Sequence, residues 1–543
     1  MGFLSKLIKE SWRIHTKKKA IARLIILSAL ILSCCQKSPT LVKQKQILRT
    51  ALSYDVNSMD PRLGANMTSQ SVIRSTFTGL VYLDKDLVPQ LDLASSYRVS
   101  SDFKTYIFFL RECCWSDGSA ITAKDFEESW KSVLTPAFAS LNTNLFYFIK
   151  NGKKAFEGVV SIDQVGVHAI DEKTLVVELE EPNPSFLNVL TSSIFFPVHE
   201  SMRYEKGFHE KIVSSGPFRL KKHLLQDQIV LEKNPFYWQA EKTHLDEIQF
   251  FIIKDAATAM LLFEKKELDW LGEPTARLSL DSIPTIKAQG KLNWVDGAGL
   301  NWLFINTKKP PYSNVNIRKA LAYSIDRSKI MKDILHIDNV CPPLGLIPKI
   351  LKNEKWHPWF QDNDRKKAQE CFAQGLQELG ITLREFPPIV ISYVHDASYS
   401  KIVQAVQQMW QETLGVTVKS ECSDGPVFAR KLFDLDYDIA RSGWVLQYND
   451  PGNLLDIFKY KKLQPNFSGW ENPHYIEESN AAYSACGEDK WAHWEAAEKI
   501  FFDEMPSIPL IDVSLGHIRQ DYVKNVYVNS LHQISFRDAY IEK

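Results

Sequence analysis

The sequence predicts an α/β protein with more than one hydrophobic core, and three observations support this. The chain has 543 residues, which exceeds one simple domain and suits two or three cores. A strand–helix–strand pattern occurs in the C-terminal half, and strand patterns rich in aromatic and branched residues occur nearer the N-terminus. Hydrophobic residues make up 45% and charged residues 24%, which is the composition of an ordinary globular protein.

The strand–helix–strand pattern begins at Ile389–Val394, which is predicted as a strand. A helix follows and ends at Gly415, and Val416–Val418 begins the next strand. The apolar residues on one face of that helix are Tyr399, Ile402, Val403, Val406, Met409 and Trp410. A βαβ unit implies parallel strands and a right-handed crossover. A loop rich in Pro and Trp, Cys341–Phe360, interrupts this α/β region.

Two further strands are predicted in the N-terminal half, at Phe103–Arg111 and Lys173–Glu180. Between them, Thr122 with Asp125 three residues later predicts a helix N-terminus. The residues expected on the buried face of this helix are Phe126, Trp130 and Val133.

The N-terminus predicts a signal peptide over residues 1–33. A basic stretch ends at Arg23, and the apolar run Leu24–Leu32 is too short for a transmembrane helix. The small residue before Cys34 is typical of a bacterial lipoprotein processing site, so Cys34 is predicted to carry a lipid and residues 34–46 to form a tether. A plain signal peptide cleaved nearby and a signal anchor remain alternatives.

Charge and cysteine content exclude some functions. Without residues 1–33 the chain has 58 basic and 64 acidic residues, a net charge of −6, so no nucleic-acid surface is expected. Besides Cys34 and Cys35, the chain has six cysteines: Cys113, Cys114, Cys341, Cys371, Cys422 and Cys486. None forms a C-x-x-C motif, so their spacing assigns no disulfide, and buried free thiols are expected.

The segment Tyr437–Pro451 is the most informative in the chain. A short strand, Asp438–Ala440, leads into Arg441, and Gly443 is followed by Trp444. A glycine beside an aromatic residue lets another backbone approach next to a flat apolar wall. The guanidinium of Arg441 is a fixed fork suited to a carboxylate.

This segment resembles the ligand-cleft segment of the oligopeptide- and dipeptide-binding proteins of ATP-driven importers. Further segments, in the same order over most of residues 47–543, extend the resemblance. They are Met59–Arg62, Phe77–Leu80, Leu110–Arg111, Trp115–Gly118, Thr122–Phe126, Ser215–Phe218, Leu231–Pro235, Tyr237–Trp238, Asn306–Tyr312 and Ile317–Tyr323. Most of these short segments are expected to be scaffold, with Trp115 filling a core beside a tight turn at Asp117-Gly118.

The resemblance implies a two-lobed, periplasmic-binding-protein-like fold with mixed sheets and two chain crossings. Lobe I is expected to comprise residues 47–77, 202–296 and 513–543. An extra subdomain at 78–201 would sit on lobe I, and lobe II would span 297–512. The ligand would be enclosed when the lobes close.

The resemblance also assigns expected ligand contacts. Arg441 matches a basic residue that meets ligand carboxylates, and Trp444 matches an aromatic pocket wall. Gly443 and Val445 match backbone positions that pair with an extended peptide, and Met67 matches the facing backbone of lobe I. The structural alternatives are an ion pair for Arg441 and a core role for Trp444.

Two positions depart from the family pattern. Gln447 stands where the family has an aspartate that captures the α-amine of the peptide. Because the glutamine side chain is neutral, it brings no counter-charge to that amine. Either another acid substitutes, Asp450 being nearest in sequence, or the ligand amine is not buried as usual. Gly425 stands where a tryptophan is common, before the Phe428 position. A changed ligand preference is expected: peptides with modified or differently placed amines, or peptide-like cell-wall fragments.

The sequence therefore predicts a monomeric, non-enzymatic substrate-binding lipoprotein that delivers peptides to an ABC permease and its ATPase subunits. It would be exported and anchored on the periplasmic or cell-surface side of a bacterial membrane, without cofactor or metal. Metallopeptidase, calcium-loop, dinucleotide and serine-hydrolase motifs are incomplete; His199-Glu200, for example, lacks the second histidine of H-E-x-x-H. The alternatives are a binder of murein peptide, metal chelate or haem, and a surface receptor or adhesin.

Overall fold

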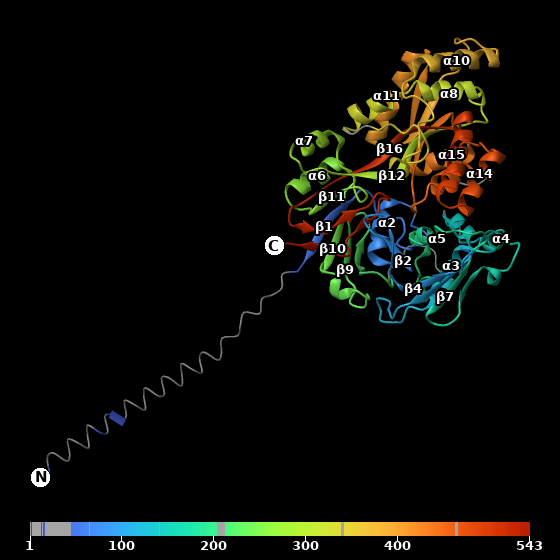
Figure 1. Ribbon diagram of the computed structural model, residues 1–543. Helices are drawn as coiled ribbons and strands as arrows, with labels where there is room; N and C mark the ends of the chain where they lie inside the picture. Colours follow the sequence, from blue (N-terminus) through green and yellow to red (C-terminus); the bar gives the residue numbers. More distant parts are fainter. Residues whose placement is uncertain are drawn as a thin grey trace. The chain divides into compact units, whose positions relative to one another are not determined.

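The computed structural model describes residues 45–64, 66–138, 140, 142–203, 212–337, 341–461 and 465–542, with four isolated positions before residue 45 (Figure 1). The chain divides into two compact units, Met1–Lys45 and Gln46–Lys543, and the sheets and cores belong to the second. The predicted signal peptide, apart from those isolated positions, and Cys34 lie outside the described residues. No helix in the described ranges has both the length and the apolar content needed to cross a bilayer.

A mixed ten-stranded sheet runs through the second unit. In sheet order its strands are β14 (Val418–Ser423), β13 (Ile389–Val394), β15 (Ile439–Val445), β12 (Asn293–Ile305), β16 (Ser507–Arg519), β11 (Trp270–Gly272), β1 (Ile47–Leu52), β10 (Glu247–Ile252), β9 (Gln228–Lys233) and β8 (Phe218–Leu224). Strand β13 is parallel to β14 and β15, and β1 is parallel to β10 and β11. The other pairings are antiparallel. The predicted α/β class is confirmed.

The predicted βαβ unit is also confirmed. Helix α11 (Ala397–Leu414) joins β13 to its parallel neighbour β14. The face of α11 from Ile402 to Trp410 that was predicted to be apolar is buried, with Trp410 fully enclosed. Gly415 ends the helix in the left-handed conformation, at a φ of 73° that favours glycine.

Strands β12 and β16 lie at the middle of the sheet and link its two sides. On one side β12 pairs with β15, and on the other β16 pairs with β11. We call β14, β13 and β15 the lobe II strands, and β11, β1, β10, β9 and β8 the lobe I strands. The β12–β16 register breaks between Asp296 and Leu300. There, a side chain on Gly297 would meet the carbonyl oxygen of Val513 at 2.7 Å, so the close approach requires glycine.

A separate four-stranded sheet lies within residues 94–178. Its order is β4 (Ala94–Val99), β5 (Thr105–Leu110), β7 (Thr174–Glu178) and β6 (Val167–Ala169). Helix α3 (Ala123–Val133) packs on it and begins with the predicted capping box of Thr122 and Asp125. Its predicted face is fully buried. The indole nitrogen of Trp130 donates to the Phe195 carbonyl at 2.9 Å.

The remaining elements are shorter or lie around the sheets. They are α2 (Met67–Thr76), β2 (Val81–Leu83), β3 (Pro89–Leu91), α4 (Gly152–Phe156), α5 (Phe186–Val189), α6 (Ala256–Glu264), α7 (Ile283–Ala288), α8 (Val315–Tyr323), α9 (Arg327–Lys329), α10 (Arg365–Leu379), α12 (Gly425–Asp434), α13 (Gly452–Leu455), α14 (Pro473–Ser484), α15 (Gly487–Glu504), β17 (Val523–Lys524), β18 (Tyr527–Val528), β19 (Ile534–Ser535) and β20 (Tyr540–Ile541).

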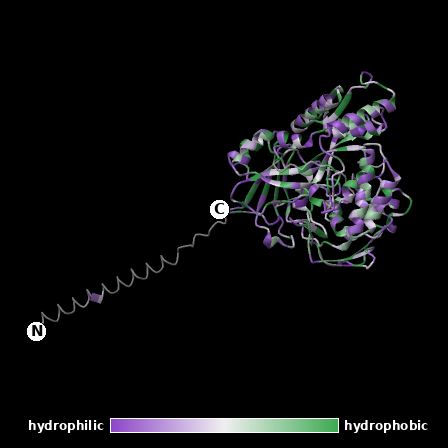
Figure 2. Cartoon of the chain, turned by 45° about the horizontal axis from the view of Figure 1, so that its top comes forward, coloured by the Kyte–Doolittle hydropathy of each residue, from purple (hydrophilic) through white to green (hydrophobic). Residues whose placement is uncertain are grey.

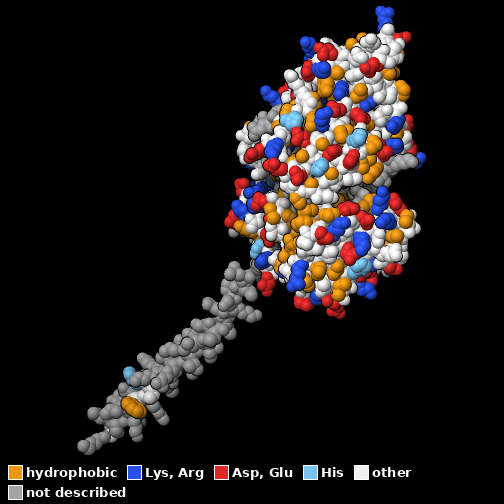
Figure 3. All heavy atoms as spheres, turned by 45° about the vertical axis from the view of Figure 1, so that its right-hand side comes forward, with side chains coloured by type: hydrophobic (Ala, Val, Ile, Leu, Met, Phe, Trp, Pro, Cys, Tyr) orange, Lys and Arg blue, Asp and Glu red, His pale blue; other side chains and the backbone are white. Residues whose placement is uncertain are grey.

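Three buried apolar clusters hold these elements together. The first joins the lobe I strands to the four-stranded sheet, the second lies around the lobe II strands, and the third packs α6 and α7 against β1 and β16. In Figure 2 hydrophobic colour follows the strands, while the helices at the surface show hydrophilic faces. On the face seen in Figure 3, basic and acidic side chains are interspersed.

Several short segments singled out in the sequence form buried ion pairs or hydrogen-bonded turns. Arg62 pairs with Asp60 at 2.7 Å with both side chains fully buried, and it also donates to the carbonyl oxygens of Met202 and Arg203. Trp115 is 1% exposed, and the amide of Gly118 bonds its carbonyl to close the predicted turn. These segments are scaffold, as expected.

Asp92, in the region predicted as the extra subdomain, is bonded to two segments of lobe I. Its fully buried carboxylate accepts hydrogen bonds from Thr78 and Arg537 and, at 2.7 Å, from the indole nitrogen of Trp238. The ion pair with Arg537 places two charges in a site shielded from water. Removing one partner would leave the other charge uncompensated.

The six described cysteines are free thiols. Cys113 and Cys371 are buried, as expected for structural thiols, and burial raises the pKa of Cys113 to about 12. The expectation of burial is wrong for Cys422 and Cys486, which are exposed. Cys422 lies on β14, the edge strand of the sheet, where the four consecutive residues from Lys419 to Cys422 are exposed.

We predict that Asp92→Asn lowers the free energy of unfolding by about 3–5 kcal/mol, because Arg537 would remain buried without its counter-charge. Urea unfolding followed by circular dichroism measures the change. Asp86→Asn is the matched control, since Asp86 pairs with Lys85 while both side chains are about two-thirds exposed. Equal losses in the two variants would show that the Asp92 pair contributes no more than a surface pair.

The stability of the protein is expected to depend on pH through Asp512, which lies on β16 and is 8% exposed. Both of its carboxylate oxygens are buried without a hydrogen-bond partner among the described residues. Burial raises its pKa to about 7, and Asp296 raises it further, against the lowering effect of Lys352 and Lys349. The folded state therefore holds this proton more tightly than the unfolded chain. The contribution of this proton to the free energy of unfolding is full below about pH 4 and is lost as the pH rises through about 7.

We predict that the unfolding free energy of Asp512→Asn minus that of the wild type increases from pH 5 to pH 8, by up to about 1.4 kcal/mol per pH unit. Urea unfolding at each pH measures it, with Asp86→Asn as the reference substitution. A difference that stays constant with pH would contradict the prediction.

Candidate functional site

The predicted contact residues lie on β15, in the loop after it, and at the start of α2. Strand β15 holds Arg441, Gly443, Trp444 and Val445 next to β12, so the crossing strands position them. Met67 is the first residue of α2 and is half-buried, with Asn66 as the N-cap. The carbonyl of Met67 accepts from the Ser71 hydroxyl at 3.0 Å, a bond within the helix.

Arg441 is a buried cation without an acidic partner among the described residues. Its side chain is 7% exposed, and its guanidinium carbon lies 3.3 Å from the centre of the Tyr399 ring. One Nη donates to Asn301, while Nε has no hydrogen-bond partner. Burial lowers the pKa of Arg441, with Tyr399 acting in the opposite direction. A guanidinium in this state can bind a carboxylate.

Trp444 lies on the opposite face of β15 from Arg441, because successive strand residues alternate. Its ring packs against the lobe II core, and its indole nitrogen donates to Asn453 at 3.3 Å. At Gly443 a Cβ would meet Asn301 Oδ1 at 2.6 Å, so a larger residue there would displace the Asn301 side chain that accepts from Arg441. Val445 pairs with Gly299 beside the register break of β12.

Gln447 contacts the region predicted as the extra subdomain. Its side-chain amide nitrogen donates to the Asn142 side-chain oxygen at 2.7 Å, and its backbone amide donates to Asn453 at 2.7 Å. Nearby, Asn449 donates to the Leu87 carbonyl at 3.4 Å. The position that the sequence resemblance matched to a charged amine anchor therefore holds a neutral side chain that is bonded to a second neutral amide.

Asp450 is 3% exposed and already carries a counter-charge. It forms an ion pair with Lys490 of α15 and accepts the backbone amide of Gly452 at 2.8 Å. Lys490 also reaches the Ser185 hydroxyl at 3.1 Å. This carboxylate is therefore poorly placed to replace the missing aspartate as an amine anchor.

Sequence reasoning missed Asn301, Tyr399, Arg277 and Asn142, which surround the predicted residues. Tyr399 was assigned only to the buried face of α11. It is half-buried, and its hydroxyl accepts from Arg277 at 2.7 Å. Burial alone would raise the pKa of Tyr399, but Arg441 and Arg277 outweigh it and lower the pKa. The position of Tyr399 at the start of α11, shortly after a strand end, was a signal in the sequence that could have placed it at the site. Arg277 and Asn142 belong to no motif that could have marked them.

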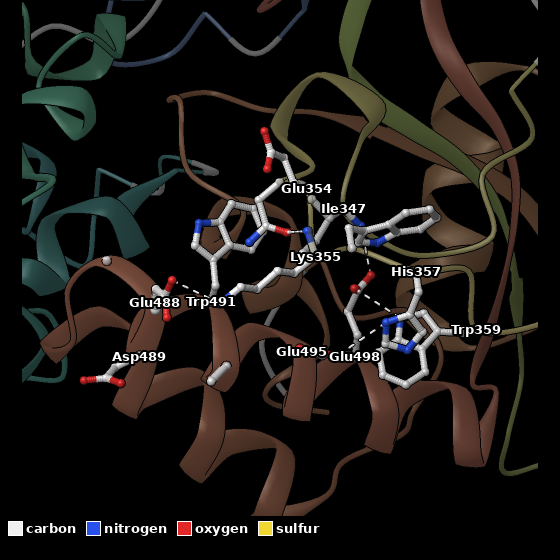
Figure 4. Close-up of a pocket in the computed structure, with 14 residues that line it drawn as sticks. Ile347, Glu354, Lys355, His357, Trp359, Glu488, Asp489, Trp491, Glu495 and Glu498 are labelled. Atoms are coloured by element: carbon white, nitrogen blue, oxygen red, sulfur yellow. Dashed lines mark hydrogen bonds and ion pairs between the residues drawn. The ribbon is translucent and has the colours of Figure 1, made fainter.

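A separate cavity of about 590 Å³ lies between the Pro/Trp-rich loop and α15 (Figure 4). Trp356, Trp359 and Trp491 line it, together with several carboxylates. Glu498 accepts the backbone amide of Ile347 at 3.0 Å and the indole nitrogen of Trp359 at 3.2 Å. Burial raises the pKa of Glu498 in spite of these donors. The carboxylate fastens the loop onto α15, and none of the predicted contact residues lines this cavity.

Comparison with known proteins identifies close relatives of the chain. Residues 88–465 match the profile of the bacterial extracellular solute-binding proteins, family 5. The chain is 35% identical to the oligopeptide-binding protein OppA of Bacillus subtilis, over 97% of this chain and 100% of that protein.

Two solved structures are similar over nearly the whole described fold. An oligopeptide-binding protein of Borrelia burgdorferi, OppAIV, gives a TM-score of 0.83 at 26% identity, covering 92% of this chain and all of that one. The murein tripeptide-binding protein MppA of Escherichia coli gives a TM-score of 0.84 at 25% identity, covering 93% of this chain and all of that one. The predicted two-lobed solute-binding fold is confirmed.

Proposed function

Because the chain belongs to the bacterial extracellular solute-binding proteins of family 5, we propose that it captures peptides between two lobes and delivers them to the permease of an ABC importer. Members of this family bind substrates and are not enzymes, so the prediction of a non-enzymatic peptide-binding protein of the importer type is confirmed. Delivery to a permease and its ATPase subunits belongs to the proposal. The observation that carries it is Arg441, a buried guanidinium without an acid partner among the described residues.

We propose the division into lobes as expected from the sequence. Lobe I comprises residues 47–77, 202–296 and 513–543; the extra subdomain is 78–201 and lobe II is 297–512. Strands β12 and β16 run without interruption across the proposed boundaries. Closing would then be a movement about the register break near Gly297, where the ladder is already interrupted.

Peptide capture would combine one charge contact with main-chain hydrogen bonds. The carboxylate of the ligand would bind Arg441, while Gly443 and Val445 offer strand backbone on lobe II and Met67 faces them from lobe I. Main-chain bonding suits a carrier of mixed peptides, since every peptide offers the same groups. The ring of Trp444 packs into lobe II, which supports the core role that was the alternative to a pocket wall.

The preferred ligand is one whose amine is absent, modified or placed elsewhere. Gln447 is neutral and bonded to Asn142, and Asp450 is neutralised by Lys490. A buried ammonium would find no free counter-charge at either side chain, which is costly. The likeness to MppA, which by its name binds a murein tripeptide, favours peptide-like cell-wall fragments as a second candidate ligand.

We also propose that residues 1–33 direct export and that Cys34 carries the lipid that holds the protein at the outer face of a bacterial membrane. The support is the order of basic stretch, apolar run, small residue and cysteine in the sequence. The extracellular character of the family agrees with export.

We predict that the wild type binds an N-acetylated tripeptide at least as tightly as the free tripeptide, and that Gln447→Asp shifts the preference toward the free amine by tenfold or more, as a charged hydrogen bond contributes about 1.5–3 kcal/mol. Titration calorimetry measures both. Gln404→Asp, at an exposed position of α11, controls for the added charge. Much tighter binding of the free peptide by the wild type would refute the altered preference.

A further inference from the structure

An arginine of lobe I reaches the N-terminus of the lobe II helix α11. Arg277 follows β11, and its neighbours Ala276 and Leu278 are buried in the lobe I cluster around α6. Its guanidinium forms an ion pair with Asp396 and donates to the Tyr399 hydroxyl at 2.7 Å. In Figure 1, α11 accordingly lies beside the segment that contains α6 and α7. We call Arg277, Asp396 and Tyr399 the clasp.

The lobe II half of the clasp is fixed in place by α11 itself. Asp396 is the N-cap of this helix and accepts the backbone amides of Ser398 at 2.9 Å and Tyr399 at 3.2 Å. Its position therefore does not depend on Arg277. The ion pair can form only where lobe I and lobe II meet, because its two partners are anchored in different cores.

The clasp shares the Tyr399 ring with the predicted carboxylate anchor. The guanidinium carbon of Arg441 lies 3.3 Å from the ring centre, and that of Arg277 lies 4.9 Å from it. Two cations thus contact one phenol, one from each lobe. Arg277 adds a second cation to the surroundings of Arg441, while Asp396, whose charge acts on Arg441 in the opposite direction, is already paired with Arg277.

From this geometry we infer that Arg277, acting across Tyr399, couples lobe closure to occupation of Arg441 by a ligand carboxylate, which makes Arg277 and Tyr399 specificity-determining residues. The inference rests on the proposed function, in which Arg441 binds that carboxylate. A bound carboxylate supplies Arg441 with the counter-charge that its own surroundings lack, so closing is favourable with an acid ligand. With a neutral ligand end, closing leaves Arg441 buried, without an anion, next to Arg277.

The expected size of the coupling is modest. The Arg277 side chain is 42% exposed, so solvent screens its effect on Arg441. We expect about a fivefold contribution to the discrimination between acid and neutral ligands, at the lower end of usual coupling between sites.

The chain provides a matched control at a second ion pair between the lobes. Lys401 of α11 pairs with Asp281 at 3.1 Å, with side chains 50% and 87% exposed. Neither residue contacts the Tyr399 ring in the described structure. Breaking this pair removes one contact between the lobes and leaves the surroundings of Arg441 unchanged.

The test uses one N-acetylated tripeptide with either a free C-terminal carboxylate or a C-terminal amide, so that the amine plays no part. Titration calorimetry gives the ratio of the two affinities for the wild type, Arg277→Gln, Arg277→Lys and Lys401→Gln. We expect the wild type to prefer the acid, and Arg277→Gln to reduce the ratio about fivefold. Arg277→Lys keeps the charge and should retain most of the ratio, and Lys401→Gln should leave it unchanged.

Small-angle scattering at saturating ligand adds a readout of closure. The wild type should be more compact with the acid than with the amide, whereas Arg277→Gln should be equally compact with both. A wild type that fails to distinguish acid from amide refutes Arg441 as the carboxylate anchor, and with it the proposed mode of binding. A wild-type preference that persists unchanged in Arg277→Gln refutes the coupling alone.

Discussion

The pairing of β12 with β16 is the constraint on which the rest of this structure depends. These two strands carry the hydrogen-bonded ladder from the lobe I strands to the lobe II strands, and β15 takes its place from β12. The register of this pair breaks at Gly297, which is the hinge that we propose for lobe closing. The same strand pair fixes Arg441 beside β12 and would carry the proposed movement.

Charge distribution then defines what the site can hold. Arg441 keeps a desolvated positive charge, while the positions that could offer a negative charge to an amine are neutral at Gln447 or already paired at Asp450. A site with this imbalance favours a ligand that brings one anion and no buried cation. In the proposed function, a peptide-binding scaffold is thus combined with an electrostatic environment that would narrow the range of its ligands.

Local features of the fold could be predicted from the sequence, because periodicity and capping are encoded within a few residues. The βαβ unit ending at Gly415 and the capping box at Thr122 are examples. Contacts between distant segments could not, because no local pattern marks them: Lys490 neutralises Asp450 across 40 residues, and Arg277 reaches Tyr399 across 122. The predicted contact residues remain predictions. Simple strand alternation could have separated Trp444 from Arg441, since three positions along a strand change the face.

In the proposed function, contacts between the lobes must be weak enough to let a ligand decide between open and closed forms. The Lys401–Asp281 pair meets this condition, because its side chains are 50% and 87% exposed and such a pair is worth about 1 kcal/mol or less. A few such contacts offset part of the entropy lost on closing without locking the protein shut. The choice of ligand must then come from groups that change their charge balance on closing. We propose Arg441 as that group, because it is buried without an acidic partner among the described residues while Arg277, on the other side of the Tyr399 ring, remains partly exposed.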